Sequence, residues 1–243
     1  MKTRRDSVKS ILLAMAFFMV TACQWWQAKP STLVLRFYPF VGDSPLALSS
    51  GLYPNPGGEG SYSIRDFQFF ISNLKFKGKE AEHRVPQSYH LARFDNQQGI
   101  YELAITLPGG QEFDLMELGI GVDPEANGTI TVAGDLDPNG RMAWSWDVGY
   151  KFILLEGRLN QGDKLLPLVY HVGFDENYTT TAFSLPGDTD VLNLKVDIAR
   201  LFTANTPVDL ASLPTVKFDR ADAARIGEGL NTMLSMCKDE CAE

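Results

Sequence analysis

The chain has 243 residues, with 22 Lys and Arg against 30 Asp and Glu, a formal net charge of −8. Apolar residues make up 44% and charged residues 21%, which is typical of a folded protein with a core and excludes intrinsic disorder and collagen-like repeats. The acidic balance argues against nucleic acid as a partner, because phosphate binding needs clustered Lys and Arg. Three histidines and three cysteines leave few ligands for a transition metal.

The N-terminus has the pattern of an export signal. Residues 11–20 form an unbroken apolar run, which is shorter than the roughly 20 residues that span a bilayer and matches the apolar region of a secretory signal. A basic start precedes it, formed by Lys2, Arg4, Arg5 and Lys9. We therefore expect residues 1–22 to be a signal peptide.

The end of this segment, Val20-Thr21-Ala22-Cys23, resembles the bacterial lipobox. The resemblance implies cleavage before Cys23 and lipidation of its thiol; the alternative is an ordinary signal peptide that ends near a cysteine. Position 24 is Gln rather than Asp, so retention at an inner membrane is not signalled. The expected location is the cell envelope, lipid-anchored at the outer membrane and facing the periplasm or the cell surface. Removal of residues 1–22 leaves 18 basic and 29 acidic residues, a net charge of −11.

Residues 23–30 are expected to be a tether, and residues 31–243 a single domain. Short β-favouring segments follow one another with turn residues between them, a pattern typical of an all-β antiparallel sandwich of Greek-key or immunoglobulin-like type with long loops. The expected strands are residues 32–38, 67–76, 89–94, 101–107, 113–122, 129–133, 143–155, 166–172, 179–185 and 191–198.

A C-terminal helix is expected over about residues 219–238. Asp219 is a suitable N-cap, although Gly227 and Gly229 each cost about 1 kcal/mol inside a helix. One apolar stripe recurs at helical spacing, formed by Ala223, Ile226, Leu230, Met233, Leu234 and Cys237.

Cys237 and Cys241 have C-x-x-x-C spacing, which places both on one helix face if the helix extends that far. Three states are open: a short-loop disulfide, a soft metal site helped by Met233 and Met236, or free thiols. An exported protein lives where disulfides persist, so the disulfide is favoured.

Four segments carry a family resemblance. They run FQFFISNLKF (67–76), YHLARFDN (89–96), DLDPNGRMAWSWDVGYKFILL (135–155) and YHVGFDENY (170–178). In order and spacing they resemble the MbnP family, the copper-binding proteins associated with methanobactin systems. The most specific match is M-x-W-x-W-x-x-G-Y-K-F, which begins at Met142, and the H-x-G at His171 supports it.

The resemblance implies a β-sandwich that binds copper through histidines and a kynurenine, an oxidised tryptophan. By position, His171 is the first ligand candidate and His90 the second, and Trp144 and Trp146 are the candidates for oxidation. It also implies a partner, a di-haem cytochrome c peroxidase-like (MbnH-like) protein that performs the oxidation. No W-x-H or H-x-W pair is present, and such a pair is how related proteins place kynurenine beside histidine.

The residues themselves allow a second interpretation. Neutral imidazole suits copper, but a histidine in an apolar strand is more often satisfied by a hydrogen bond than by a metal. Trp144 and Trp146 alternate along a strand and so share one side, where they can serve as packing aromatics. Tyr150 is on the same even-numbered side and is either a relay or a packing residue.

The segment Asp135-Leu136-Asp137-Pro138-Asn139-Gly140 resembles the first half of an EF-hand loop. Trp146 stands at the twelfth position, where a bidentate Glu belongs, so a full EF-hand is rejected. A capped turn is favoured, and a looser Ca²⁺ site helped by Asp123 or Asp175 is an open alternative.

No motif of a hydrolase, metalloprotease or phosphate-binding loop is present in the sequence, so the chain is not expected to be an enzyme. The leading hypothesis is an exported copper-binding lipoprotein. The alternative is a structural or adhesive β-sandwich surface lipoprotein without a metal.

Overall fold

The computed structural model describes residues 28–96, 99–129, 132–145, 148–187, 189–237 and 241. The expected signal peptide, Cys23 and most of the tether lie outside these residues, as does Trp146. Within the described part of the chain, no helix is long and apolar enough to cross a membrane.

A five-stranded sheet forms one layer. Its order is β15-β13-β1-β2, and β7 also pairs with β1, on the edge opposite β13. The strands are β1 (Ser31–Val41), β2 (Ser44–Pro45), β7 (Tyr101–Leu107), β13 (Val191–Asp197) and β15 (Leu234–Met236). In β1 and β13 every second side chain is buried, as expected for strands with one face on a core.

A ten-stranded sheet forms the other layer. Its order is β12-β8-β4-β10-β11-β14, with β3, β5 and β6 paired to β4 and β9 paired to β10. The strands are β3 (Tyr53–Pro54), β4 (Ser61–Lys77), β5 (Glu82–Arg84), β6 (Tyr89–Arg93), β8 (Leu115–Ile120), β9 (Ala143–Ser145), β10 (Gly149–Gln161), β11 (Lys164–Gly173), β12 (Thr179–Ser184) and β14 (Thr215–Val216).

The expected all-β sandwich is confirmed, with one difference in strand direction. The pairs β1–β13 and β11–β14 are parallel rather than antiparallel. Parallel neighbours need a long crossover connection, and 149 residues separate the end of β1 from the start of β13. Such a pairing is not visible in the local pattern of either strand.

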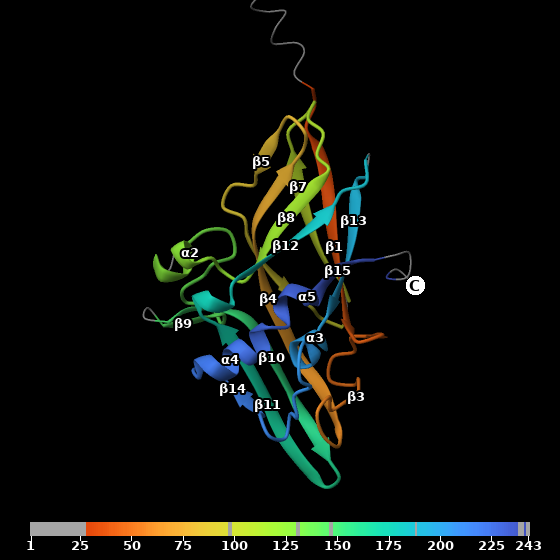
Figure 1. Ribbon diagram of the computed structural model, residues 1–243, viewed down its shortest axis with the longest axis vertical. Helices are drawn as coiled ribbons and strands as arrows, with labels where there is room; N and C mark the ends of the chain where they lie inside the picture. Colours follow the sequence, from red (N-terminus) through yellow and green to blue (C-terminus); the bar gives the residue numbers. More distant parts are fainter. Residues whose placement is uncertain are drawn as a thin grey trace, which may run out of the picture.

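Short helices cover part of the main core. Figure 1 shows α3, α4 and α5 in front of the lower part of the ten-stranded sheet. Their buried side chains belong to the same cluster as the sheet residues Leu155 and Tyr170. The helices are α2 (Pro124–Thr129), the 3-10 helix η1 (Asp175–Asn177), α3 (Arg200–Thr203), α4 (Arg220–Gly227) and α5 (Leu230–Met233).

The C-terminal segment differs from the single helix expected over about residues 219–238. Asp219 does cap α4, because its side chain accepts a hydrogen bond from the Asp222 backbone N–H. The chain then breaks at Gly229, where a Cβ would lie 2.3 Å from the Arg200 carbonyl oxygen. After α5 the chain becomes β15 and pairs with β13, so tertiary pairing replaces the last helical turns.

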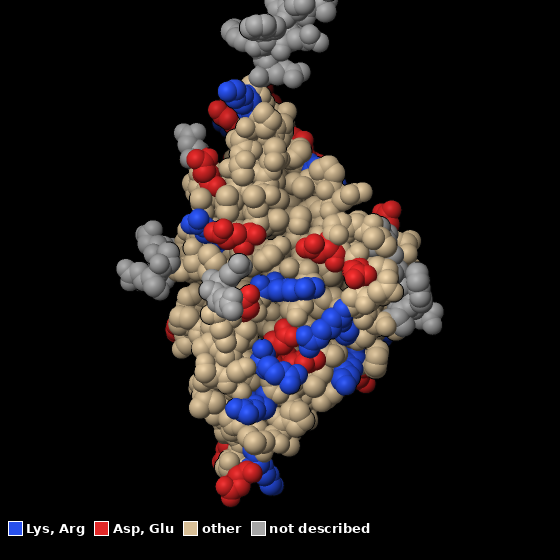
Figure 2. All heavy atoms as spheres, turned by 180° about the vertical axis from the view of Figure 1, so that it is seen from behind, with Lys and Arg blue, Asp and Glu red and all other residues tan. Residues whose placement is uncertain are grey.

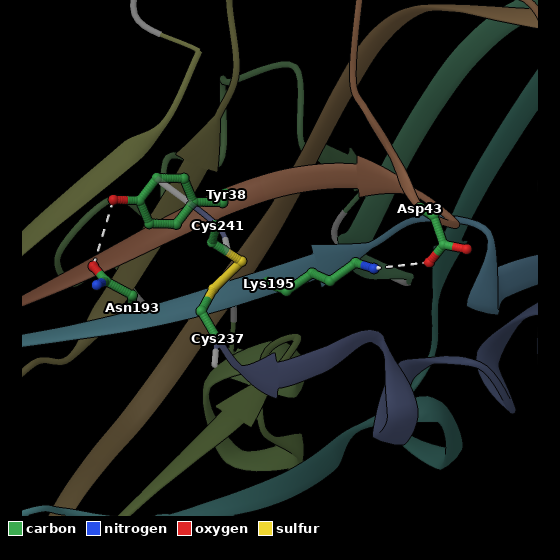
Figure 3. The surroundings of a disulfide bond; sticks show 6 residues. All are labelled: Tyr38, Asp43, Asn193, Lys195, Cys237 and Cys241. Carbon is green, nitrogen blue, oxygen red and sulfur yellow. Dashed lines mark hydrogen bonds and ion pairs between the residues drawn. A yellow bond between two sulfur atoms is a disulfide. The ribbon is translucent and has the colours of Figure 1, made fainter. Parts of the chain in front are cut away.

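Cys237 and Cys241 form a disulfide directly after β15. Figure 3 shows it beside β13, near Asn193 and Lys195. Tyr38 donates a hydrogen bond to Asn193, and Lys195 pairs with Asp43 at 3.8 Å. The disulfide thus closes the end of the edge strand. Because its loop is short, chain entropy predicts a stabilisation of only about 2 kcal/mol.

Two expected strands are modified. Residues 143–155 are divided into β9 and β10, which pair with each other. The strand expected over residues 129–133 is absent from its described part, since Thr129 ends α2 and residues 132 and 133 have no regular structure. A smaller second core explains this: α2 and the chain after it fold over the far side of the ten-stranded sheet, where Ala126, Leu136 and Met142 pack with Phe70 and Phe152.

Candidate functional site

The centre of the ten-stranded sheet has two chemically different faces. The inner face points into the main core and carries Phe69 and Ile153, which are paired across β4 and β10. The adjacent pair, Gln68 and Leu154, therefore points to the opposite side, which we call the outer face. Leu154 belongs to the second core, so the outer face is apolar at that point and polar beyond it.

His171 lies on the outer face of β11, directly opposite Leu154. Its side chain is 15% exposed, and its Nε2 is 3.2 Å from Glu156 Oε1. Burial lowers the pKa of His171, and the positive charges of Lys151 and Lys217 lower it further, although Glu156 acts in the opposite direction. The imidazole is therefore neutral at pH 7, the state in which it can bind a metal.

Glu156 forms ion pairs with two arginines of the outer face. Its Oε2 accepts hydrogen bonds from Arg65 at 2.5 Å and pairs with Arg141 at 2.9 Å. Arg141 also pairs with Asp66. Burial alone would raise the pKa of Glu156, but hydrogen bonds from Arg65 and His171 outweigh it and hold the pKa below its ordinary value. Figure 2 views the molecule from the side opposite to Figure 1 and shows basic side chains gathered around acidic ones on this face.

Trp144 lies on β9 and covers the upper end of β11. A Cβ at Gly173 would be 2.7 Å from the indole ring, so glycine is needed there for the close approach. The ring packs against Phe174 and Phe218, with centroids 5.2 and 5.5 Å away. Phe218 is 64% exposed, so this aromatic group reaches the surface.

Lys151 is close to Trp144 and interacts electrostatically with His171. Its ammonium group is 6.0 Å from the Trp144 ring centroid, and its charge acts on His171. It donates hydrogen bonds to the Arg141 and Ala143 carbonyl oxygens at 2.6 and 3.1 Å. Burial lowers the pKa of Lys151, and the charge of Arg141 adds to this effect. The structure thus brings His171 and Trp144 to one neighbourhood.

His90 is on the other side of the sheet. It pairs with Ile71 of β4, three residues from Gln68, and three positions along a regular strand reverse the face. His90 Nε2 is 3.2 Å from Ser88 Oγ, and burial lowers the pKa of His90. The two histidines therefore point to opposite faces, and one ion cannot contact both imidazoles in this fold.

Tyr150 is fully buried in the second core and makes an edge contact with Phe70 at 6.0 Å between centroids. Burial raises the pKa of Tyr150. A role as a relay stays a prediction, and so does the oxidation of Trp146, which is outside the described residues.

The acidic residues considered for Ca²⁺ are engaged by hydrogen-bond donors of the protein. Asp135 accepts from the Leu91 N–H and Asp137 from the Asn139 N–H. Asp123 accepts from Tyr89 O–H, and Asp175 from the Asn127 amide. Among the described residues, no group of three or more His, Cys, Asp or Glu side chains could hold a metal ion.

Sequence reasoning missed the residues around His171: Asp66, Arg141, Lys151 and Glu156. One signal was available, because Glu156 ends the apolar run Phe152–Leu155 of a buried strand, where a charge needs a partner. The partners themselves come from β4, β11 and the segment before β9, and no local pattern connects these segments.

Comparisons with known proteins agree on one family. The MbnP family model matches residues 30–218. The solved structure of MbnP from Methylosinus trichosporium superposes with a TM-score of 0.58 at 13% sequence identity, covering 86% of this chain and 99% of that chain. No curated protein matched the sequence. Because the family model spans most of the chain, the protein belongs to the MbnP family.

Proposed function

We propose that this protein is an exported lipoprotein of the MbnP family that binds copper and is not an enzyme. Family membership supports this, together with the signal-like N-terminus that ends at Cys23. The proposed location is the cell envelope, with a lipid anchor on Cys23. The proposed partner is a di-haem cytochrome c peroxidase-like protein that oxidises a tryptophan to kynurenine.

The observation that carries the proposal is the position of Trp144 relative to His171. The indole covers Gly173, which is two residues from His171 on the same face of β11, a separation of roughly 7 Å. The imidazole is held neutral by burial, and the aromatic group is open to the surface through Phe218. A partly exposed tryptophan near a neutral histidine is compatible with oxidation of the indole followed by metal binding.

The donor set fits copper only in part. His90 and His171 point to opposite faces, so the two-histidine site that the family resemblance implies does not fit this fold. On the outer face the chain supplies the imidazole of His171 and the carboxylate of Glu156. We therefore assign the primary ligand to His171, and the proposal makes Trp144 rather than His90 the source of a further ligand.

Copper titration of protein co-expressed with the di-haem partner tests this assignment. His171→Ala is expected to lose copper binding by at least about tenfold, since removal of one ligand from a site with few ligands is costly. His90→Ala is the matched control and should bind as the unaltered chain does. Peptide mass spectrometry should locate the oxidation at Trp144 and show none in Trp144→Phe. Absence of copper uptake, with Trp144 and Trp146 both intact, would sink the proposal.

The second candidate is a structural or adhesive surface lipoprotein without a metal. It is favoured by the opposite faces of His90 and His171, and by the polar neighbours of each imidazole, Ser88 and Glu156. This candidate predicts that replacing both histidines leaves function in the cell unchanged. A loss of cell-bound copper on His171→Ala alone would count against it.

A further inference from the structure

A hollow of about 360 Å³ crosses β4, β10 and β11 below the charged cluster. This volume is within the range of small-molecule sites. One wall is polar and the other apolar, formed by Ser63, Arg65, Arg158, Leu165, Leu166 and Pro167. The proposed copper ligand His171 does not line it, but Arg65 does and also contacts Glu156, so the hollow adjoins the proposed metal site.

The polar wall carries a guanidinium group, that of Arg158, which pairs with none of the residues that the structure describes. Arg158 is exposed and pairs in register with Ser63 of β4 and Pro167 of β11. Its side chain has no ion pair or hydrogen bond within the described residues. An exposed arginine beside a hollow, with no partner among the described residues, can pair with an anion. Guanidinium groups match carboxylates in shape and bind them through two hydrogen bonds.

A β-bulge adds a second cation to this wall. The pairing of β4 with β10 shifts between Glu156 and Gly157, so that Asp66 and Ile64 pair with adjacent residues and Arg65 is extra. The bulge lets Arg65 and Asp66 both point outward, which strict alternation forbids. Arg65 is 71% exposed and uses one nitrogen to contact Glu156, so its remaining donors stay available.

The apolar wall of the hollow is exposed to solvent. Leu165 is 63% exposed and lies two residues from Pro167 on the same side of β11. Single exposed leucines are common on protein surfaces. Here, however, Leu165 and Pro167 lie on one side of β11 and face two arginines across one hollow, while Leu166 between them packs against the main core. An apolar surface opposite a cationic one favours a ligand that has both an apolar chain and an anionic group.

We propose that this hollow binds an amphipathic carboxylate. Its carboxylate pairs with Arg158 and with the free donors of Arg65, and its apolar chain lies on Leu165 and Pro167. The inference goes beyond copper binding and does not depend on it.

Isothermal titration of the full mature chain with octanoate tests the proposal. Two further probes are acetate, which has the carboxylate without the long apolar chain, and octanol, which has the chain without the carboxylate. Octanoate should bind with an affinity at least about tenfold higher than either, because each wall adds a separate contribution. Arg158→Gln should weaken octanoate binding by about tenfold, the effect of losing one charge-assisted contact. Leu165→Ser should weaken octanoate and leave acetate unchanged.

Arg84→Gln is the matched control. Arg84 is also an exposed arginine, pairs with Glu82 and lies near the other end of β4, so the change in net charge is the same. It should leave octanoate binding unaltered. Equal binding of acetate and octanoate, equal binding of octanol and octanoate, or equal losses in Arg158→Gln and Arg84→Gln would each overturn the proposal. Copper binding should be unchanged in Arg158→Gln, so this test and the copper test fail independently.

Discussion

Glu156 shows how a single residue organises the outer face. A partly buried carboxylate costs free energy unless charged or hydrogen-bonded partners compensate. Here the partners are Arg65, Arg141 and His171. Since Arg65 and Arg141 are 71% and 49% exposed, water screens these pairs, and each contributes little stability by itself. Their consequence is positional, because they set the charge around the His171 imidazole.

The two partly buried histidines predict how stability depends on pH. Burial lowers the pKa values of His90 and His171 below their ordinary value of 6.5. Above pH 6.5 both the folded and unfolded chains hold these imidazoles neutral, and the stability is fully present. As pH falls below 6.5, the unfolded chain takes up protons first, so the free energy of unfolding decreases until the pH passes the lowered pKa values. Urea denaturation between pH 7.5 and about 5 measures this slope.

The double variant His90→Gln and His171→Gln provides the control, because it removes both titrating groups. Its free energy of unfolding should vary less over this range than that of the unaltered chain. Glu156 also has a lowered pKa, but its contribution is lost only as the pH falls below its ordinary value of 4.5, outside the range. An identical slope in both proteins would show that other groups control the pH dependence.

At the scale of the element, the bulge in β4 lies beside a close approach of β4 to β10. A Cβ at Gly157 would lie 2.1 Å from the Ser63 carbonyl oxygen, a backbone atom held in the sheet by the β4–β10 pairing. The bulge that exposes Arg65 therefore depends on glycine at position 157.

Gly157→Ala is expected to destabilise the protein by about 1–3 kcal/mol, the usual cost of forcing an extra carbon into a packed position. Urea denaturation measures this as a lower midpoint with an unchanged slope. Gly128→Ala is the control, since a Cβ there meets nothing within 4 Å and alanine is the better helix former in α2. Equal midpoints for the unaltered chain and Gly157→Ala would show that the two strands can move apart without cost.

The C-terminal segment shows the limit of element prediction from sequence. The N-cap at Asp219 and the stripe that includes Ala223 and Ile226 were readable, and both residues are fully buried. Leu234 also belongs to that stripe, but it lies in β15 and packs into the core from there. Helical periodicity cannot show that an unpaired edge of β13 is available for the last residues of the stripe.

At the scale of the whole molecule, β1 joins distant parts of the chain. It hydrogen-bonds to β13 on one side and β7 on the other, and it buries Leu33, Leu35 and Phe37 at 2%, 0% and 0% exposure. Full burial of each such side chain is worth about 1.5–3 kcal/mol. Together they are comparable to the total stability of a domain, about 5–15 kcal/mol.

Deletion of residues 1–41 is therefore expected to abolish cooperative folding, whereas a chain that begins at Ala28 retains every described contact and should fold. Thermal unfolding followed by near-ultraviolet circular dichroism separates the two outcomes. A cooperative transition in the chain without β1 would show that the ten-stranded sheet and its helices fold without the five-stranded sheet.

The sequence by itself determined the class of this protein: an acidic chain of short β-strands with few metal ligands. It also pointed to the family, because the W-x-W-x-x-G-Y-K-F and H-x-G segments are local patterns. Only the tertiary structure decided that His90 and His171 point apart, that cations from three segments meet at Glu156, and that Arg158 has no partner among the described residues. The physical reason is that alternation defines two faces on each strand, while the register and order of strands decide which faces coincide. Pairing such as β1 with β13 is set by contacts far apart in the sequence.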